Sequence, residues 1–174
     1  DLLARPGRPA RLGPDNPPAA GGAPQLVRRS FSKVRKAARH ARADGTAAAH
    51  HALRRRAKRL RYTNEAFDGF YGDEAQKLLR TIARLQSCLG SHQDANVAAG
   101  RLQAIATLRK NRLPSETLFL MGVLSERRCA KAADAGRRVR KRYAKLRGRR
   151  WKDLRRGMDD LAHAQAAAAK RAPA

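Results

Sequence analysis

The chain has 174 residues, of which 31% are charged and only 5% are aromatic. Forty lysines and arginines face 14 acids, so the formal net charge is +26 and the isoelectric point is about 11.7. This imbalance indicates an anionic partner, such as a nucleic acid, a polyphosphate or an acidic membrane surface. No apolar run approaches the ~18 residues of a membrane span, and no signal peptide is visible. We expect one cytoplasmic domain that does not enter a membrane.

The first 24 residues hold six of the eight prolines and show no hydrophobic periodicity. We expect residues 1–24 to be a disordered or extended linker rich in proline and glycine. A first helix is predicted over residues 25–43, because apolar residues recur there at heptad spacing. This first seam consists of Val27, Phe31, Val34, Ala38 and Ala41.

Gly45 and Thr46 are typical of a helix end followed by a new N-cap. They predict a second helix from about Ala47 to Phe67, ended by a turn around residues 68–73. A third helix is predicted over residues 73–89, with an apolar seam of Leu78, Ile82, Leu85 and Leu89. We expect Gly90 to bend or end it and Asp94 to cap a continuation to about Lys110.

The segment 111–115 predicts a break, after which a long helix starts at Pro114 or Ser115. Phe119, Leu120, Val123 and Leu124 give this helix a strongly apolar beginning. Residues 147–150 interrupt it, and a last helix follows over 151–169. No strand signal appears. The predicted fold class is therefore all-α, an antiparallel four-helix bundle over residues 25–158 with an additional C-terminal helix and an alanine-rich tail over 159–174.

The densest cationic segment is residues 51–65, with the sequence H-A-L-R-R-R-A-K-R-L-R-Y-T-N-E. At about 100° per residue, its apolar side chains form one stripe and its cations lie opposite. Like charges at i,i+4 destabilise an isolated helix by a few tenths of a kcal/mol per pair, so an anionic ligand is the expected compensation. Glu65 follows Arg61 by one helical turn, and we expect an ion pair that holds Arg61 in place.

This segment resembles the signature of the CHAD domain, the conserved histidine α-helical domain, in the pattern H-x-L-R-x-x-x-K-R-L-R-Y-x-x-E. A second segment, Leu85-Gln86-Ser87-Cys88-Leu89-Gly90 followed by Asp94, resembles the family's L-Q-x-x-L-G-x-x-x-D element. The resemblance covers roughly residues 25–158, although only helical pattern and Trp151 carry it after Arg112. It implies an all-helical protein associated with inorganic polyphosphate.

We therefore expect non-catalytic binding of polyphosphate in a basic groove formed by helix faces. Arginine outnumbers lysine 30 to 10, which suits forked contacts with phosphate oxygens, although a GC-rich genome would give the same bias. The candidate contacts from the second helix are His51, Arg54, Arg55, Lys58 and Arg61. Those from neighbouring helices, chosen on helical phase, are Arg29, Lys33, Lys36, Arg80 and Arg84.

Other functions are less favoured by the residues. A metal ion near His51 would be repelled by Arg54, Arg55 and Lys58, and no cofactor is expected. No phosphate loop, nucleophile elbow or paired E-x-E carboxylates indicate an enzyme. Non-specific nucleic-acid binding remains the main alternative, because a basic helical protein attracts any phosphate backbone. A helical scaffold that meets an acidic protein remains a third.

We assign no function to the remaining basic runs or to the two cysteines. The basic runs 137–138, 140–142 and 149–150 are interpreted as solvated surface. Cys88 and Cys129 are interpreted as small buried thiols.

The resemblance also implies a second set of helices. CHAD domains contain two four-helix halves with basic surfaces facing a shared pore, and this chain shows one copy of each motif. We expect the chain to be one half, the C-terminal one, of such a domain. Either the N-terminal half is missing, or two copies associate. Because two cationic faces repel each other, we expect polyphosphate to bridge a homodimer. Polyphosphate granules are a candidate location in the cell.

Overall fold

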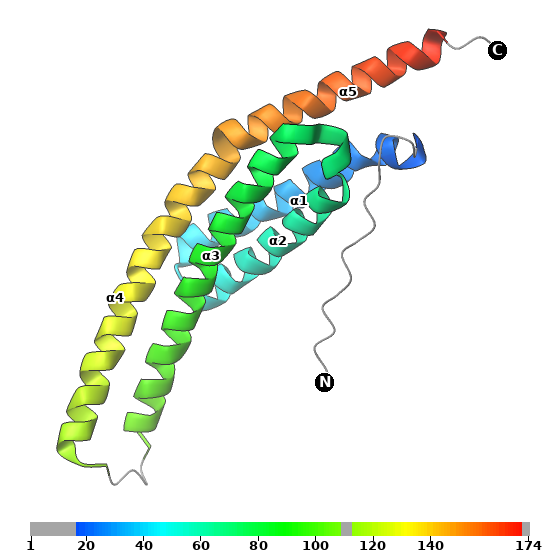
Figure 1. Ribbon diagram of the computed structural model, residues 1–174. Helices are drawn as coiled ribbons and strands as arrows, with labels where there is room; N and C mark the ends of the chain where they lie inside the picture. Colours follow the sequence, from blue (N-terminus) through cyan, green and yellow to red (C-terminus); the bar gives the residue numbers. More distant parts are fainter. Residues whose placement is uncertain (1–16, 109–112, 172–174) are drawn as a thin grey trace.

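The computed structural model describes residues 17–108 and 113–171, and every regular element in these ranges is helical (Figure 1). The predicted all-α class is therefore confirmed. The helices are α1 (Pro17–Asp44), α2 (Ala47–Ala66), α3 (Asp68–Ala106), α4 (Ser115–Lys145) and α5 (Trp151–Arg171), with a π-helical segment, Leu146–Arg150, between α4 and α5. Helices α1 to α4 pack together, and α5 is the additional helix.

Helix α1 starts at Pro17, so the prediction that residues 1–24 form a linker is wrong for residues 17–24. Residues 1–16 lie outside the described part. Ala23 is fully buried one helical turn before Val27, and it extends the apolar seam of α1 toward the N-terminus. Pro17 and Pro18 lie in the first turn, where the missing N–H of proline has no partner. Pro24 lies inside the helix, which continues through it although proline removes one backbone hydrogen bond there.

The α1–α2 hairpin follows the predicted pattern. All five residues of the first seam are buried, and Gly45 takes the left-handed conformation with φ of 64° that ends α1. The Thr46 hydroxyl oxygen accepts a hydrogen bond from the Ala49 backbone N–H at 3.2 Å, which caps α2. The two helices therefore run antiparallel, with their apolar faces together.

Helix α3 contains one sharp kink and no break at the predicted position. Gly72, with φ of 48° and ψ of −131°, makes the kink within the turn expected over residues 68–73. The expected bend or end at Gly90 and the cap at Asp94 are wrong, because α3 continues to Ala106. Leu89, Ala95 and Ala99 are all buried. Packing of this continued seam outweighs the ~1 kcal/mol that glycine costs inside a helix.

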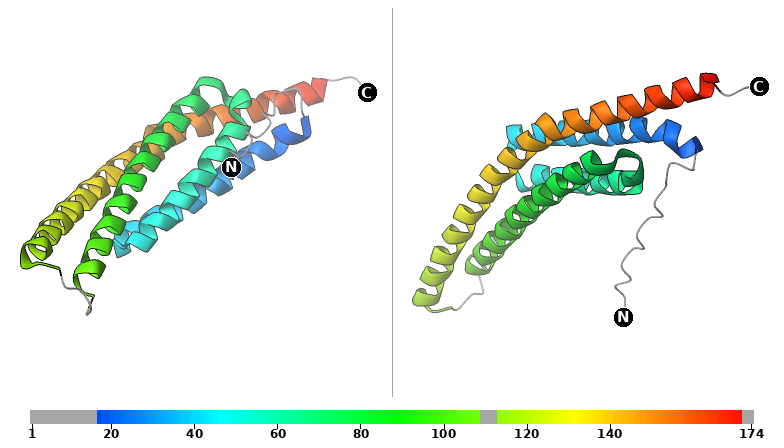
Figure 2. Two further views of the ribbon diagram at one scale, coloured as in Figure 1. Left: turned by 60° about the horizontal axis from the view of Figure 1, so that its bottom comes forward. Right: turned by 45° about the horizontal axis from the view of Figure 1, so that its top comes forward.

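The long α3–α4 hairpin extends past the α1–α2 hairpin (Figures 1 and 2). Its far end therefore has no second layer to cover it within the described part of the chain. Phe119 and Leu120, at the apolar beginning of α4, are 71% and 59% exposed. Cys129 is also exposed and Cys88 is half-buried, so the prediction of two buried thiols is wrong. Both cysteines are free.

The predicted interruption at residues 147–150 is the π-helical segment, where Gly148 departs from helical geometry. Beyond it, α5 lies against α1. The rings of Phe31 and Trp151 stack with centroids 3.8 Å apart, and Arg28 forms an ion pair with Asp159. Leu154 and Met158 are fully buried, so the start of α5 belongs to the core. The expected tail over 159–174 is helical as far as Arg171.

Candidate anion-binding groove

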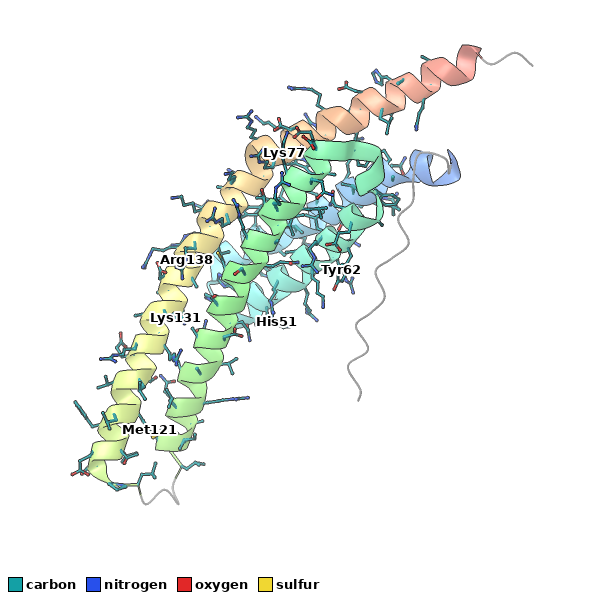
Figure 3. The ribbon with its side chains drawn as sticks, in the orientation of Figure 1. His51, Tyr62, Lys77, Met121, Lys131 and Arg138 are labelled. Carbon is teal, nitrogen blue, oxygen red and sulfur yellow. The ribbon has the colours of Figure 1, made fainter. Side chains whose placement is uncertain are left out.

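The predicted cations of α2 lie together around one groove. It has a volume of about 440 Å³ and is lined by His51, Arg54, Arg55, Lys58, Arg61 and Gln86. Five of these residues come from α2, and Gln86 comes from α3. Figure 3 labels His51 toward one end of the exposed side of α2 and Tyr62 toward the other. We call this site the α2 groove. Within the part of the chain that the structure describes, no carboxylate and no aliphatic side chain lines it.

The opposite face of α2 fixes the direction of these cations. Leu53, Ala57, Leu60 and Asn64 are at most 1% exposed, and Phe67 is also buried. The Asn64 amide donates a hydrogen bond of 2.8 Å to the Leu60 carbonyl oxygen within the same turn. The predicted apolar stripe is thus the buried one. A helix with one face fixed in the core must present the other to solvent.

Arg61 joins the two sequence motifs. Its Nη1 donates a hydrogen bond of 3.0 Å to Gln86 Oε1 on α3. Its Nε lies 3.2 Å from Glu65 Oε1, which confirms the expected ion pair. Gln86 Nε2 is buried and has no acceptor among the described residues. The first motif therefore supplies the cation, and both motifs hold it in one orientation.

Tyr62 is a second organiser of the α2 cations. Lys58 Nζ lies 5.6 Å from the centroid of its ring, and Arg61 Cζ lies 5.3 Å from it. Both distances fit cation–π attraction, which is worth about 0.5–1 kcal/mol at exposed sites. The ring thus keeps two long cationic side chains near each other despite their repulsion.

Two of the cations predicted on α1 lie in a neighbouring groove. Arg29 and Lys33 line a space of about 560 Å³ together with Arg56 and Arg59 of α2, and Tyr62 also lines it. Arg56 and Arg59 are not among the contacts predicted from the sequence. Their helical phase lies between the buried stripe and the α2 groove, so only the position of α1 reveals their role. We call this second site the α1–α2 groove.

Lys36, Arg80 and Arg84 are exposed and line neither groove. The structure thus brings seven of the ten predicted contacts into two adjacent grooves and leaves these three outside. Asp94, from the second motif, lines a separate space of about 500 Å³ between α3 and α4 with Arg101 and Arg128.

The buried histidines differ from the exposed His51. His50 and His92 stack with ring centroids 4.1 Å apart, and the His50 Nδ1–H donates to the Thr46 carbonyl oxygen at 2.9 Å. Burial, and secondarily the charge of His50, lowers the pKa of His92. Within residues 17–108 and 113–171, no three histidine, cysteine or acidic side chains gather as metal ligands.

No helix in the described part of the chain combines the length and the apolar character that crossing a bilayer requires.

Comparison with known proteins gives one match. The family model described as the CHAD domain matches residues 1–103, which include both motifs and most of α3. The match stops short of residue 158, to which the resemblance was expected to extend. No curated protein and no solved structure matches the chain.

Proposed function

Because the chain belongs to the CHAD domain family, whose members are generally linked to polyphosphate, we propose that it binds inorganic polyphosphate in the α2 groove. The observation that carries this proposal is the lining of the groove. Four permanent cations, one histidine and one amide surround it, and among the described residues no carboxylate or aliphatic side chain lines it. Cations and hydrogen-bond donors dominate such a lining, and this suits a bare phosphate chain.

The donors match the ligand in kind. A guanidinium presents a planar fork that can contact two phosphate oxygens, and Lys58 adds a compact ammonium group. His51 donates one hydrogen bond when neutral and two when protonated. Gln86 Nε2 is buried and has no acceptor among the described residues, and a small movement of its side chain would let a bound phosphate supply one. Counterion release would accompany these contacts, so affinity should fall steeply with salt.

The contacts around Arg61 support a preorganised site. Its hydrogen bond to Gln86 and its ion pair with Glu65 already hold the guanidinium. Less side-chain entropy is then lost when the ligand arrives. We propose that Arg61 makes a fixed contact that positions the phosphate chain. Arg54, Arg55 and Lys58 would supply most of the other contacts, which can differ from one bound chain to the next.

A long ligand can use more than one groove. Tyr62 lines the α1–α2 groove, and its ring contacts Lys58 and Arg61 of the α2 groove. We propose that a long polyphosphate continues from the α2 groove past Tyr62 to Arg29 and Lys33. Lys36, Arg80 and Arg84 would attract its free ends without fixed contacts.

We propose no catalysis. In the part of the chain that the structure describes, neither groove is lined by a carboxylate that could hold Mg²⁺ against a phosphate. The proposed partner is thus a ligand that is held and not cleaved. We further propose that the chain forms one half of a larger basic surface, completed by an N-terminal half or by a second copy that polyphosphate bridges.

Non-specific nucleic-acid binding is the competing function. Both ligands carry repeated phosphates, so electrostatics attracts either of them. The lining favours polyphosphate, because single-stranded nucleic acids are usually held by aromatic side chains that stack on bases. Among the described residues, no aromatic side chain lines the α2 groove, whereas Tyr62 and Phe67 line the α1–α2 groove.

Competition would test the proposal directly. A fluorescent single-stranded oligonucleotide is bound to the full chain and displaced with long polyphosphate at matched phosphate concentration. We expect polyphosphate to displace the oligonucleotide well below equal phosphate concentration. Failure to displace it at equal concentration would favour the nucleic-acid function instead.

A further inference from the structure

A third basic cavity, on the other side of α2, differs in chemistry from the two grooves. It lies between α1, α4 and the π-helical segment and has a volume of about 700 Å³, which is within the usual range of small-molecule sites. We call it the α1–α4 cavity. Its two walls are rows of arginines, its floor is mostly apolar, and His50 of α2 also lines it.

The walls follow from helical spacing. Arg35, Arg39 and Arg42 lie on one face of α1, at intervals of four and three residues. Arg140 of α4 and Arg147 of the π-helical segment line the other side. None of these five guanidiniums has an ion-pair partner among the residues that the structure describes, and no carboxylate lines the cavity. The walls therefore favour an anion.

The floor consists of side chains that the α2 groove lacks. Ala38, Ala41, Leu53 and Val139 are all less than 9% exposed and line the cavity. Tyr143 is half-buried between Arg140 and Arg147, and its ring packs against the apolar core. Burial raises the pKa of the Tyr143 phenol, while the charges of Arg147, Arg35 and Arg39 oppose that rise. The hydroxyl therefore stays protonated and lies among cations.

A bare phosphate chain would leave this apolar floor unused. An organic phosphate can cover it with a flat group while its phosphates meet the arginines. Aromatic bases stack on tyrosine rings and on guanidinium planes. From this combination we propose that the α1–α4 cavity binds a nucleoside polyphosphate, with the base against Tyr143 and Val139 and the phosphates between the two arginine rows.

The proposal requires that the organic part contributes to binding. Isothermal titration calorimetry of the full chain carrying Arg54→Gln and Lys58→Gln, which weaken the α2 groove, would compare ATP with inorganic tripolyphosphate, without divalent cations and at fixed ionic strength. Tripolyphosphate carries at least as many negative charges, so charge alone cannot favour ATP. We expect ATP to bind about tenfold more tightly, as the stacking of one base allows. Equal affinities, or tighter tripolyphosphate, would overturn the proposal.

Two variants assign the binding to this cavity. Tyr143→Leu keeps an apolar floor but removes the ring, and it should abolish the preference for ATP. Ala144→Glu places a negative charge on an exposed position of the lining, and it should weaken the binding of ATP about tenfold or more. The matched control is Ala133→Glu, an exposed alanine on the same helix outside the cavity.

Each outcome decides the proposal separately from the polyphosphate function. If Ala144→Glu and Ala133→Glu weaken ATP binding alike, only net charge matters and the cavity is not the site. If Tyr143→Leu keeps the full preference for ATP, the stacking role is wrong. Because Ala144 is exposed, its variant should keep the fold, which circular dichroism checks. Polyphosphate binding in the α2 groove should persist in these variants.

Discussion

Removal of two charges from the α2 groove is the perturbation that distinguishes a site from bulk attraction. Arg54→Gln with Lys58→Gln removes two cations that line the groove and are exposed at its surface. Neither side chain has an ion-pair partner among the described residues, so no acid is left unpaired. The double variant should therefore keep its helicity and stability.

The expected loss follows from the exposure of these side chains. Exposed charge pairs are worth at most about 1 kcal/mol each, so two contacts contribute at most about 2 kcal/mol. That limit corresponds to binding of polyphosphate that is weaker by up to about 30-fold. If each contact neutralises one phosphate of a flexible chain, the slope of log affinity against log salt should fall by about 1.4.

The assay is a titration of labelled polyphosphate at several salt concentrations, followed by fluorescence anisotropy. The control is Arg137→Gln with Arg138→Gln, which changes net charge equally on α4 (Arg138 is labelled in Figure 3). Both control side chains pair with Asp134, at 3.3 and 2.8 Å, and neither lines the α2 groove. If the two double variants lose affinity and salt slope equally, the groove is not the site and the proposed contacts are wrong.

Further predictions follow from single contacts. Gln86→Leu removes the hydrogen bond to Arg61 and should weaken polyphosphate binding about threefold to tenfold. If titration shows an unchanged affinity, Arg61 is not preorganised by Gln86. Affinity should rise as pH falls from about 8 to 6, because protonated histidine attracts phosphate, and His51→Ala should flatten this rise; the same slope in the variant would exclude His51. The pKa of His92 is lowered in the folded state, so the folded chain binds fewer protons than the unfolded chain. The free energy of unfolding should therefore fall as pH drops below about 6.5. Chemical denaturation should show a smaller fall in the His92→Gln variant. Light scattering should find a monomer without ligand and a dimer bridged by long polyphosphate, whereas a stable dimer without ligand would contradict bridging.

The helices themselves could be predicted from local pattern. The seams from Val27 to Ala41 and from Leu78 to Leu89 are buried as expected, because heptad spacing fixes which face of a helix is apolar. The Thr46 cap and the ion pair between Arg61 and Glu65 were also predicted, since both lie within one helical turn. Residues this close in sequence meet whatever the tertiary fold.

The contacts between helices could not be predicted in the same way. Helical phase shows that Arg56 points away from the seam, but it does not show that α1 lies beside it. The Gln86 contact with Arg61 spans 25 residues of sequence, and the stacked pair of His50 and His92 joins α2 to α3. Phe119 was apolar enough for a core, yet it is exposed because, in the described part of the chain, no second hairpin reaches the start of α4.

Polyphosphate is proposed to occupy the α2 groove and not the whole cationic surface. Modification of arginines with phenylglyoxal, mapped residue by residue by mass spectrometry, measures this directly because arginines are spread along the chain. With one equivalent of a short polyphosphate, we expect Arg54 and Arg55 to be protected while Arg137 and Arg138 stay reactive. Equal protection of all four arginines, or protection of the α4 pair alone, would contradict the account.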